Sequence, residues 1–371
     1  MTFNLNNCTY PVEFANYQRN SHVQAEVRRE WGLAWSRSFI EIDPELMISP
    51  RAVLVGDTII AAKTASQLFI YDASGKFNFM ERTGNPSPVV LGSGGMAYFN
   101  EAGGLVYQDY HRMKLRSEEP VPGFDQWAYA LLIRPTMGEV LGVIQNAGIR
   151  GQRAKKFHIY RFVRNDLTRK WYYEFPGIIN HAFLTSDEKT LVSMVGEEVT
   201  LYDAESGKSG LSFKTGLINP LAASLNLEGE LVVIGTAEDV QEAKKYCKAF
   251  SLKGEELWSI ALVDPLLTQP PAVGEERCVY LVDAGCLKCV RNGEPVWSTA
   301  PIFGENTCLT VTRGNYALVL DGAMLYLYDP AGEWIFKSLI SKEGDTFGVP
   351  PAVDARGKIY VLSDRKLYCL E

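Results

Sequence analysis

Apolar and polar residues alternate along most of this chain in short runs with a period of two, the pattern of half-buried β-strands. Segments 68–72 and 325–329, LFIYD and LYLYD, are clear examples, and a glycine-containing turn follows each of them. The 3.6-residue periodicity of amphipathic helices is nearly absent. The pattern therefore predicts an all-β chain of short strands that recur about every 8–12 residues.

The strands belong to a degenerate internal repeat. One unit combines an apolar, tyrosine-bearing strand, an aspartate and a glycine turn, and it occurs as LFIYDASGK at 68–76, VTLYDAESGK at 199–208 and LYLYDPAGE at 325–333. A second, proline-led unit occurs as SPVVLGSGGMAYF at 87–99, PPAVGEERCVYLV at 270–282 and PPAVDARGKIYVL at 350–362. Repeats of about 40 residues with four short strands each are typical of β-propeller blades.

Eight such units fit into the 371 residues. Their innermost strands are predicted to begin near Arg51, Ser87, Gln126, Asn180, Asn219, Gln269, Asn306 and Val349. The last unit lacks a fourth strand, and we expect the strand at 32–42 to complete it, because an open array would leave two unpaired edges. The predicted fold is an all-β, eight-bladed β-propeller of four-stranded antiparallel blades. Residues 1–31 form an N-terminal arm packed on the propeller domain, 32–371.

Tryptophans recur at equivalent places in these units. The recurring indoles are Trp35, Trp171, Trp258, Trp297 and Trp334, and the last three are 39 and 37 residues apart. We expect them to fill the wedges between neighbouring blades, with each ring N–H bonded to a backbone acceptor. Trp31 and Trp127 do not fit this register.

The repeat units resemble those of the PQQ-type, or quinoprotein-like, β-propeller superfamily. The resemblance covers residues 10–371, and the segment 16–35 is similar to the N-terminal arm of that family. For catalytic members it implies a quinone held with calcium, near an adjacent cysteine pair and a tryptophan platform. No two cysteines are neighbours in this sequence, so we expect no cofactor, no metal site and no quinoprotein redox activity.

Charge and cysteine content restrict the partners and the compartment. Lysine and arginine number 37 against 44 aspartates and glutamates, a net charge of −7, which disfavours nucleic acid as a partner. No apolar run approaches the roughly 18 residues of a membrane helix, and no secretory signal is visible, so we expect a cytoplasmic protein without membrane association. Cys286 and Cys289 have CxxC spacing on a predicted strand, where they would be packed thiols on opposite faces.

Polar residues near the starts of the innermost strands are candidates for a ligand-binding funnel. On the face where those strands begin, which we call the top, the candidates are Arg51, Trp127, His181, Asn219, Gln269 and Asn306. They could hold a polar small molecule, and His181, which titrates near neutrality, is the best single catalytic candidate. The alternative is a water-filled channel in which these side chains are satisfied by hydrogen bonds.

A basic cluster is the second candidate site. Between residues 150 and 170, eight lysines and arginines accompany a single acid, Asp166. Arg150, Arg153, Lys155 and Lys156 lie in or beside an insertion predicted for the top face, where they would bind an anionic partner. The alternative is a solvated pair of outer strands.

Two classes of function remain open. We expect a non-catalytic propeller that binds a protein or peptide partner through its top-face loops, because GxSxG, GxGxxG and phosphate-loop patterns are missing from the sequence. The alternative is a cofactor-independent lyase, isomerase or cyclase that acts on a polar or anionic small molecule in the top-face funnel.

Overall fold

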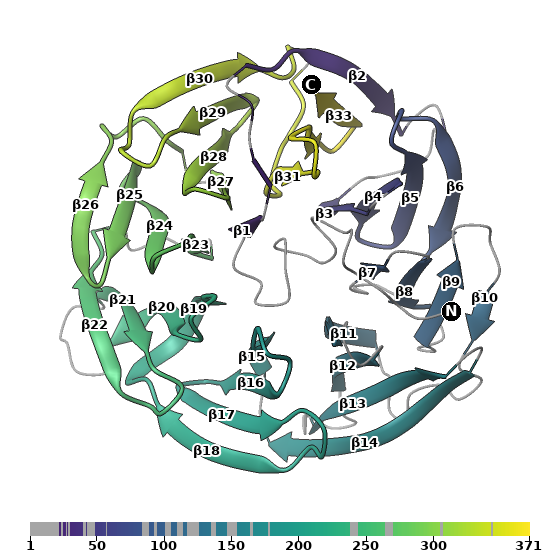
Figure 1. The fold of residues 1–371 in the computed structure, drawn as a ribbon, viewed down its shortest axis with the longest axis vertical. Helices are drawn as coiled ribbons and strands as arrows, with labels where there is room; N and C mark the ends of the chain where they lie inside the picture. Colours follow the sequence, from purple (N-terminus) through teal and green to yellow (C-terminus); the bar gives the residue numbers. More distant parts are fainter. Residues whose placement is uncertain are drawn as a thin grey trace.

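The structure is a computed structural model, and it shows an all-β propeller, which confirms the predicted architecture at that level (Figure 1). The residues that it describes are 22–23, 25–26, 28, 30–39, 42, 49–56, 58–83, 89–92, 95–100, 105–109, 114–116, 126–134, 139–146, 154–163, 166–176, 179–237, 244–263, 270–304, 307–342 and 344–371. Regular structure within these ranges consists of strands only.

The described strands form eight hydrogen-bonded sheets around a central axis, which we number as blades 1 to 8 in chain order. Blades 1 to 7 each contain four consecutive strands that step from the axis to the rim. Blades 1 to 4 comprise β3 (Pro50–Val55), β4 (Ile59–Thr64), β5 (Gln67–Asp72) and β6 (Phe77–Arg82); β7 (Val89–Gly92), β8 (Gly95–Phe99), β9 (Leu105–Asp109) and β10 (Lys114–Arg116); β11 (Gln126–Arg134), β12 (Glu139–Asn146), β13 (Ala154–Val163) and β14 (Asp166–Pro176); and β15 (Ile179–Leu184), β16 (Thr190–Val195), β17 (Glu198–Asp203) and β18 (Ser209–Lys214). Blades 5 to 7 comprise β19 (Leu217–Leu225), β20 (Leu231–Ala237), β21 (Lys245–Phe250) and β22 (Glu256–Ala261); β23 (Ala272–Val273), β24 (Cys278–Asp283), β25 (Cys286–Arg291) and β26 (Glu294–Ser298); and β27 (Cys308–Thr312), β28 (Tyr316–Asp321), β29 (Met324–Tyr328) and β30 (Trp334–Leu339).

Blade 8 is composite, because it joins the two ends of the chain. Its strands are β31 (Ala352–Val353), β32 (Ile359–Leu362), β33 (Lys366–Leu370) and β2 (Leu33–Ser38). β2 is antiparallel to β33, from Leu33 opposite Leu370 to Ser38 opposite Lys366. Two more hydrogen bonds extend this pairing: the Gly32 N–H donates to the Glu371 carbonyl at 3.0 Å, and the Glu371 N–H donates to the Gly32 carbonyl at 2.9 Å. The segment predicted to complete the last blade therefore does so.

Blade 7 corrects the predicted fold. A fifth strand, β1 (His22–Val23), lies on the axial side of β27 and runs parallel to it, with His22 opposite Val311. The prediction that every blade is a four-stranded antiparallel sheet is therefore wrong. An innermost strand presents unpaired N–H and C=O groups to the axis, and in blade 7 the N-terminal arm pairs with that edge (Figure 1).

Burial falls from the inner strands to the rim within each blade. Every residue of β4 and of β8 is buried, because these strands are covered by a neighbouring blade on both faces. The outermost strands β18 and β26 contain no fully buried residue. The short apolar runs of the sequence thus correspond to inner strands, and the mixed runs correspond to the rim.

The wedges between blades are closed by a repeated contact between an indole and a turn glycine. A Cβ atom added to the glycine would lie 2.5 to 2.7 Å from the nearest tryptophan side-chain atom in three such pairs: Trp35 with Gly75, Trp258 with Gly293, and Trp297 with Gly332. The three glycines have φ between +81° and +83°, so the close approach and the backbone both require glycine. The wedge position predicted for these three indoles is confirmed, and the predicted bond from a ring N–H to a backbone carbonyl is found for Trp297, which donates to Pro330 at 2.9 Å. The side chain of Trp171 lies outside the described part.

Trp334 does not follow that prediction. Its residue is 54% exposed, because blade 8 has no turn between its third and fourth strands onto which the indole could dock. Trp31, which falls outside the repeat register, is only 6% exposed. Its Nε1 donates to the carbonyl of Gly357 in blade 8 at 3.1 Å, and its ring meets Phe336 of blade 7 edge-on at 5.3 Å. Trp31 therefore anchors the arm to blades 7 and 8.

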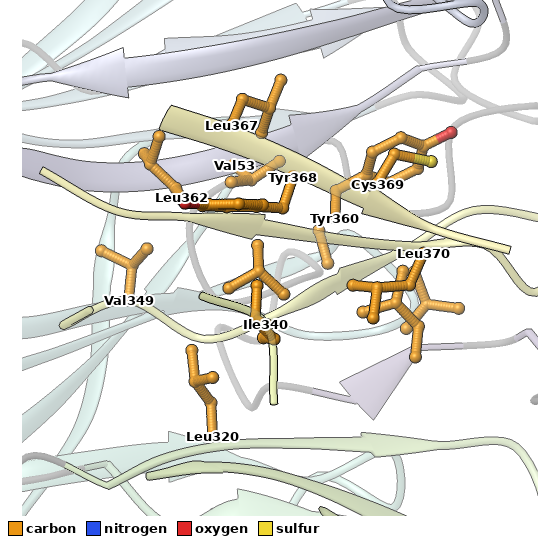
Figure 2. Packing of buried hydrophobic residues seen from close by; sticks show 14 of the residues in the cluster. Val53, Leu320, Ile340, Val349, Tyr360, Leu362, Leu367, Tyr368, Cys369 and Leu370 are labelled. Atoms are coloured by element: carbon orange, nitrogen blue, oxygen red, sulfur yellow. The ribbon is translucent and has the colours of Figure 1, made fainter. Parts of the chain in front are cut away.

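The largest core cluster lies where the ring closes. Figure 2 shows Tyr360, Tyr368 and Leu370 of blade 8 between Val53 of blade 1 and Leu320 of blade 7. Ala25 and Trp31 of the arm belong to the same cluster. The closing blade is thus held by apolar burial from both neighbours as well as by strand pairing.

Replacing Trp31 with alanine is expected to lower the free energy of unfolding by about 3–5 kcal/mol, because a buried indole and its hydrogen bond are lost. Trp334→Ala is the matched control, and its half-exposed indole should cost at most about 1 kcal/mol. Urea unfolding followed by circular dichroism measures both. Equal losses in the two variants would contradict the anchoring role of Trp31.

Candidate functional site

The structure places four of the six predicted funnel residues on innermost strands around the axis. Arg51 is exposed at the start of β3 and His181 is half-buried in β15, while Trp127 and Asn219 lie on β11 and β19. Gln269 and Asn306 lie outside the described residues. The strand assignment behind the funnel is thus reproduced, and a shared ligand pocket remains a prediction.

His181 lies next to an aromatic ring of the inter-blade core. Its imidazole stacks on Phe183, two residues further along the same strand face, with centroids 6.1 Å apart and an interplanar angle of 14°. Phe183 is buried together with Leu217 and Leu231 of blade 5. This contact holds the imidazole against the wedge between blades 4 and 5, and no acid–base role of His181 follows from it.

An extended segment of the chain itself lies at the centre of the ring. Val23 of β1 is opposite Thr312 of β27, and the next hydrogen bond runs from the Arg313 N–H to the Ala25 carbonyl at 3.2 Å. The arm therefore runs beside β27 in the direction of the bottom face, and Trp31 then contacts blade 8. The sequence gives no sign of this strand, because two residues are too few to establish a period.

Carboxylates near the top ends of second strands hold the incoming connectors in blades 6 to 8. In each case a backbone N–H of the connector donates to a carboxylate oxygen: Val263 to Asp283 at 3.0 Å, Gly304 to Asp321 at 3.1 Å, and Thr346 to Asp364 at 2.9 Å. The carboxylate of Asp283 is fully buried and also accepts a bond from Lys288 Nζ at 2.6 Å. Each of these acids thus fixes a top-face loop.

In blade 1 a buried lysine holds the top-face connector in a similar way. Lys63 is 1% exposed, and its ammonium donates to the carbonyls of Thr64 and Ala65 at 2.7 and 3.2 Å and to Thr83 Oγ1 at 2.7 Å. Thr83 follows β6, so the bond ties the turn after β4 to the connector leaving the blade. Neither Lys63 nor Asp283 stands out in the sequence, because only the strand register brings their partners close.

The basic cluster is only partly covered by the structure. Arg150 and Arg153 lie outside the described residues, and Lys155 and Lys156 lie in β13. The backbone register puts Lys156 opposite Glu174 of β14. An acid that lies outside the basic stretch 150–170 is therefore opposite one member of the cluster in the backbone register.

Two further findings concern the described residues alone. Within these ranges, no group of three or more histidine, cysteine, aspartate or glutamate side chains could hold a metal ion. No helix long and apolar enough to cross a membrane occurs in the same part of the chain.

Comparison with known proteins indicates the fold. Neither a protein-family model nor a curated protein sequence matches this chain. The solved structure of dihydro-heme d1 dehydrogenase NirN in complex with DHE matches with a TM-score of 0.57 and 13% identity over 76% of this chain, which spans 63% of that one. The Dos1 propeller matches with a TM-score of 0.64 and 7% identity over 92% of this chain and 95% of that one. At such identities the likeness shows a β-propeller and does not extend to the PQQ-like group.

Asp283→Ala should lower the free energy of unfolding by about 2–3 kcal/mol, because it leaves the Val263 N–H and the partly buried Lys288 ammonium without their acceptor. Asp364→Ala, which removes one backbone contact at a more exposed carboxylate, should cost about 1 kcal/mol. Thermal and urea unfolding report the difference. If Asp283→Ala is no more costly than Asp364→Ala, the buried anchor is not stabilising.

Proposed function

We propose that this propeller is a non-catalytic interaction module that binds an extended segment of a protein partner at the top-face opening of its channel. The supporting observation is β1, an extended piece of the chain on the axial edge of β27. Free edges of sheets take up extended peptides through main-chain hydrogen bonds, while side-chain pockets give specificity. The arm is therefore an internal model for the way in which a partner segment would dock.

Other innermost strands offer a comparable edge. In the described part of the chain, blades 1 to 6 and blade 8 end at their first strand on the axial side. β11 and β19 are nine residues long, against five for β27, so they present more main-chain donors and acceptors to a partner. We place the partner segment along these edges, beside Trp127 and Asn219.

Charge supports an acidic segment as the partner. β12 ends at Asn146 and β13 begins at Ala154, and Arg150 and Arg153 fall between them in the sequence. In our proposal these two residues, with Lys155 and Lys156 of β13, form a basic cluster at the top face of blade 3. Basic side chains at the edge of a docking site attract carboxylates and raise the rate of association.

We assign the scaffold to the PQQ-like group of propellers as part of the same proposal. The turn aspartates of its repeat units support this assignment, since Asp72, Asp203 and Asp329 each accept a backbone N–H within the following turn, at 2.7 to 2.9 Å. The six described cysteines are free thiols, which supports the cytoplasm as its compartment.

Ala25→Asp tests whether the channel edge binds a peptide. Ala25 is 4% exposed, and a carboxylate buried there without a partner should release the arm. A fluorescent peptide of residues 16–30 should then bind the variant at least about tenfold more tightly than the wild type, in which the tethered arm competes at high effective concentration. Fluorescence anisotropy measures this.

Glu26→Gln is the matched control for that experiment, because Glu26 is exposed beside Ala25 and the variant should behave as the wild type. Limited proteolysis shows whether the arm is free. If it is free in Ala25→Asp and the peptide still fails to bind, the channel-edge proposal is wrong.

Reversing the basic cluster tests the preference for acidic segments. In the Ala25→Asp background, a glutamate-rich version of the peptide should dock along β11 next to the cluster, and Arg150→Glu, Arg153→Glu and Lys156→Glu together should weaken its binding at least about tenfold at low salt. Binding of the unmodified peptide, which pairs with β27, should stay nearly unchanged. Equal effects on both peptides would remove the cluster from the recognition site.

A further inference from the structure

Two cysteines on neighbouring strands of blade 6 lie side by side near the bottom face. In the register of β24 and β25, Cys278 is opposite Arg291 and Tyr280 is opposite Cys289, so the two cysteines are diagonal neighbours on one face. Each residue is 1% exposed, and the two thiols are close enough for each to shift the pKa of the other. Cys286, the CxxC partner of Cys289, is three positions away and therefore points to the opposite face.

Donors from two blades converge on the sulphur of Cys278. Arg291 Nε lies 3.2 Å from it, and Asn315 Nδ2, from the turn after β27 in blade 7, lies at 3.8 Å. The hydrogen bond from Cys289, followed by the Arg291 guanidinium, lowers the pKa of Cys278 to about 6 from an ordinary value of 9.0. The same contact with Cys278 and burial raise the pKa of Cys289.

The surroundings of the pair differ from those of an ordinary buried thiol in this protein. Burial alone raises the pKa of Cys247 in blade 5. Around Cys278 the other titratable neighbours are Glu276, which pairs with Arg291 at 3.2 Å, and Tyr280, whose pKa is raised by burial. The fold thus gives Cys278 two nitrogen donors and a neighbouring thiol, surroundings that favour the thiolate form as in redox-sensitive cysteine pairs.

We propose that Cys278 and Cys289 form a reversible redox site that a hydroperoxide converts into a cross-strand disulfide. The Cys278 thiolate attacks one peroxide oxygen, the O–O bond breaks, and hydroxide or alkoxide leaves while Cys278 becomes a sulfenic acid. The Cys289 sulphur then displaces the sulfenic oxygen, which departs as water with the Cys289 proton. The two sulphurs supply the two electrons that reduce the peroxide, and a small-molecule thiol reverses the step by thiol–disulfide exchange.

The pair lies next to the exposed turn that precedes β24. Cys278 is the first residue of β24, directly after the exposed turn residues Glu276 and Arg277. It lies beneath Arg291, whose side chain is 44% exposed and is held outward by an ion pair with the 72% exposed Glu276. Oxidation removes the thiolate that accepts the Asn315 bond, while the two bonds between the Asn315 side chain and the Glu275 backbone, at 2.7 and 3.2 Å, remain.

Treating the full chain with hydrogen peroxide at pH 7, followed by differential alkylation and peptide mass spectrometry, tests the proposal. We expect a Cys278–Cys289 cross-link that dithiothreitol reverses, while Cys247 in the same sample stays reduced. In Cys289→Ser the reaction should stop at a sulfenic acid on Cys278 that dimedone traps. Cys247→Ser is the matched control and should cross-link at the wild-type rate.

The variant Arg291→Met tests whether Arg291 lowers the pKa of Cys278 and so makes the pair reactive, or whether the two cysteines are only close in space. In the wild type the rate of cross-linking should rise with pH through a midpoint near 6, because only the thiolate reacts. In the variant the midpoint should move upward and the rate at pH 6.5 should fall at least about fivefold. Circular dichroism confirms that the variant is folded.

Two results would overturn the proposal. One is recovery of Cys278 and Cys289 as free thiols at a peroxide concentration that oxidises the partly exposed Cys286. The other is a cross-linking rate whose pH midpoint is the same in Arg291→Met and in the wild type. The two cysteines would then be packed thiols whose reactivity Arg291 does not affect.

Discussion

The pairing of β2 with β33 is the interaction on which the rest of this molecule depends. A ring of sheets is complete only when its first and last segments share a blade, and here that blade is made from residues near both ends of the chain. The same arrangement explains two exceptions to the repeat. Blade 8 has no turn on which Trp334 could dock, and Trp31, in the chain entering β2, becomes the indole that is buried there.

The arm and the thiol pair meet at blade 7. β27 carries β1 on its axial edge, and the turn after β27 provides Asn315, which bonds Cys278 of blade 6. The proposed partner site is reached from the top and the proposed redox site from the bottom, so the two can operate on separate faces. Side chains such as Asp283 and Lys63 hold the top-face connections in place, which gives the proposed docking face a rigid frame.

The sequence was informative wherever one contact recurs blade after blade. Strand alternation, turn aspartates and tryptophan spacing predict the propeller, the closing strand and the wedge role of Trp35, Trp258 and Trp297. It was uninformative where a contact depends on register or on a single blade. β1 is too short to show a period, Cys278 and Cys289 become neighbours only across a ladder, and Glu174 faces Lys156 only after β13 and β14 pair.

Cross-linking the closing strands tests the central claim most directly. Ser38 and Lys366 are opposite each other, next to the hydrogen bond from the Phe39 N–H to the Arg365 carbonyl. Ser38→Cys combined with Lys366→Cys should therefore form a disulfide under mild oxidation, since directly opposed strand positions allow the required Cα separation. Ser38→Cys with Arg356→Cys, across the blade, should not. If both thiols of the first pair stay free while the protein is folded, the two ends of the chain do not close the ring.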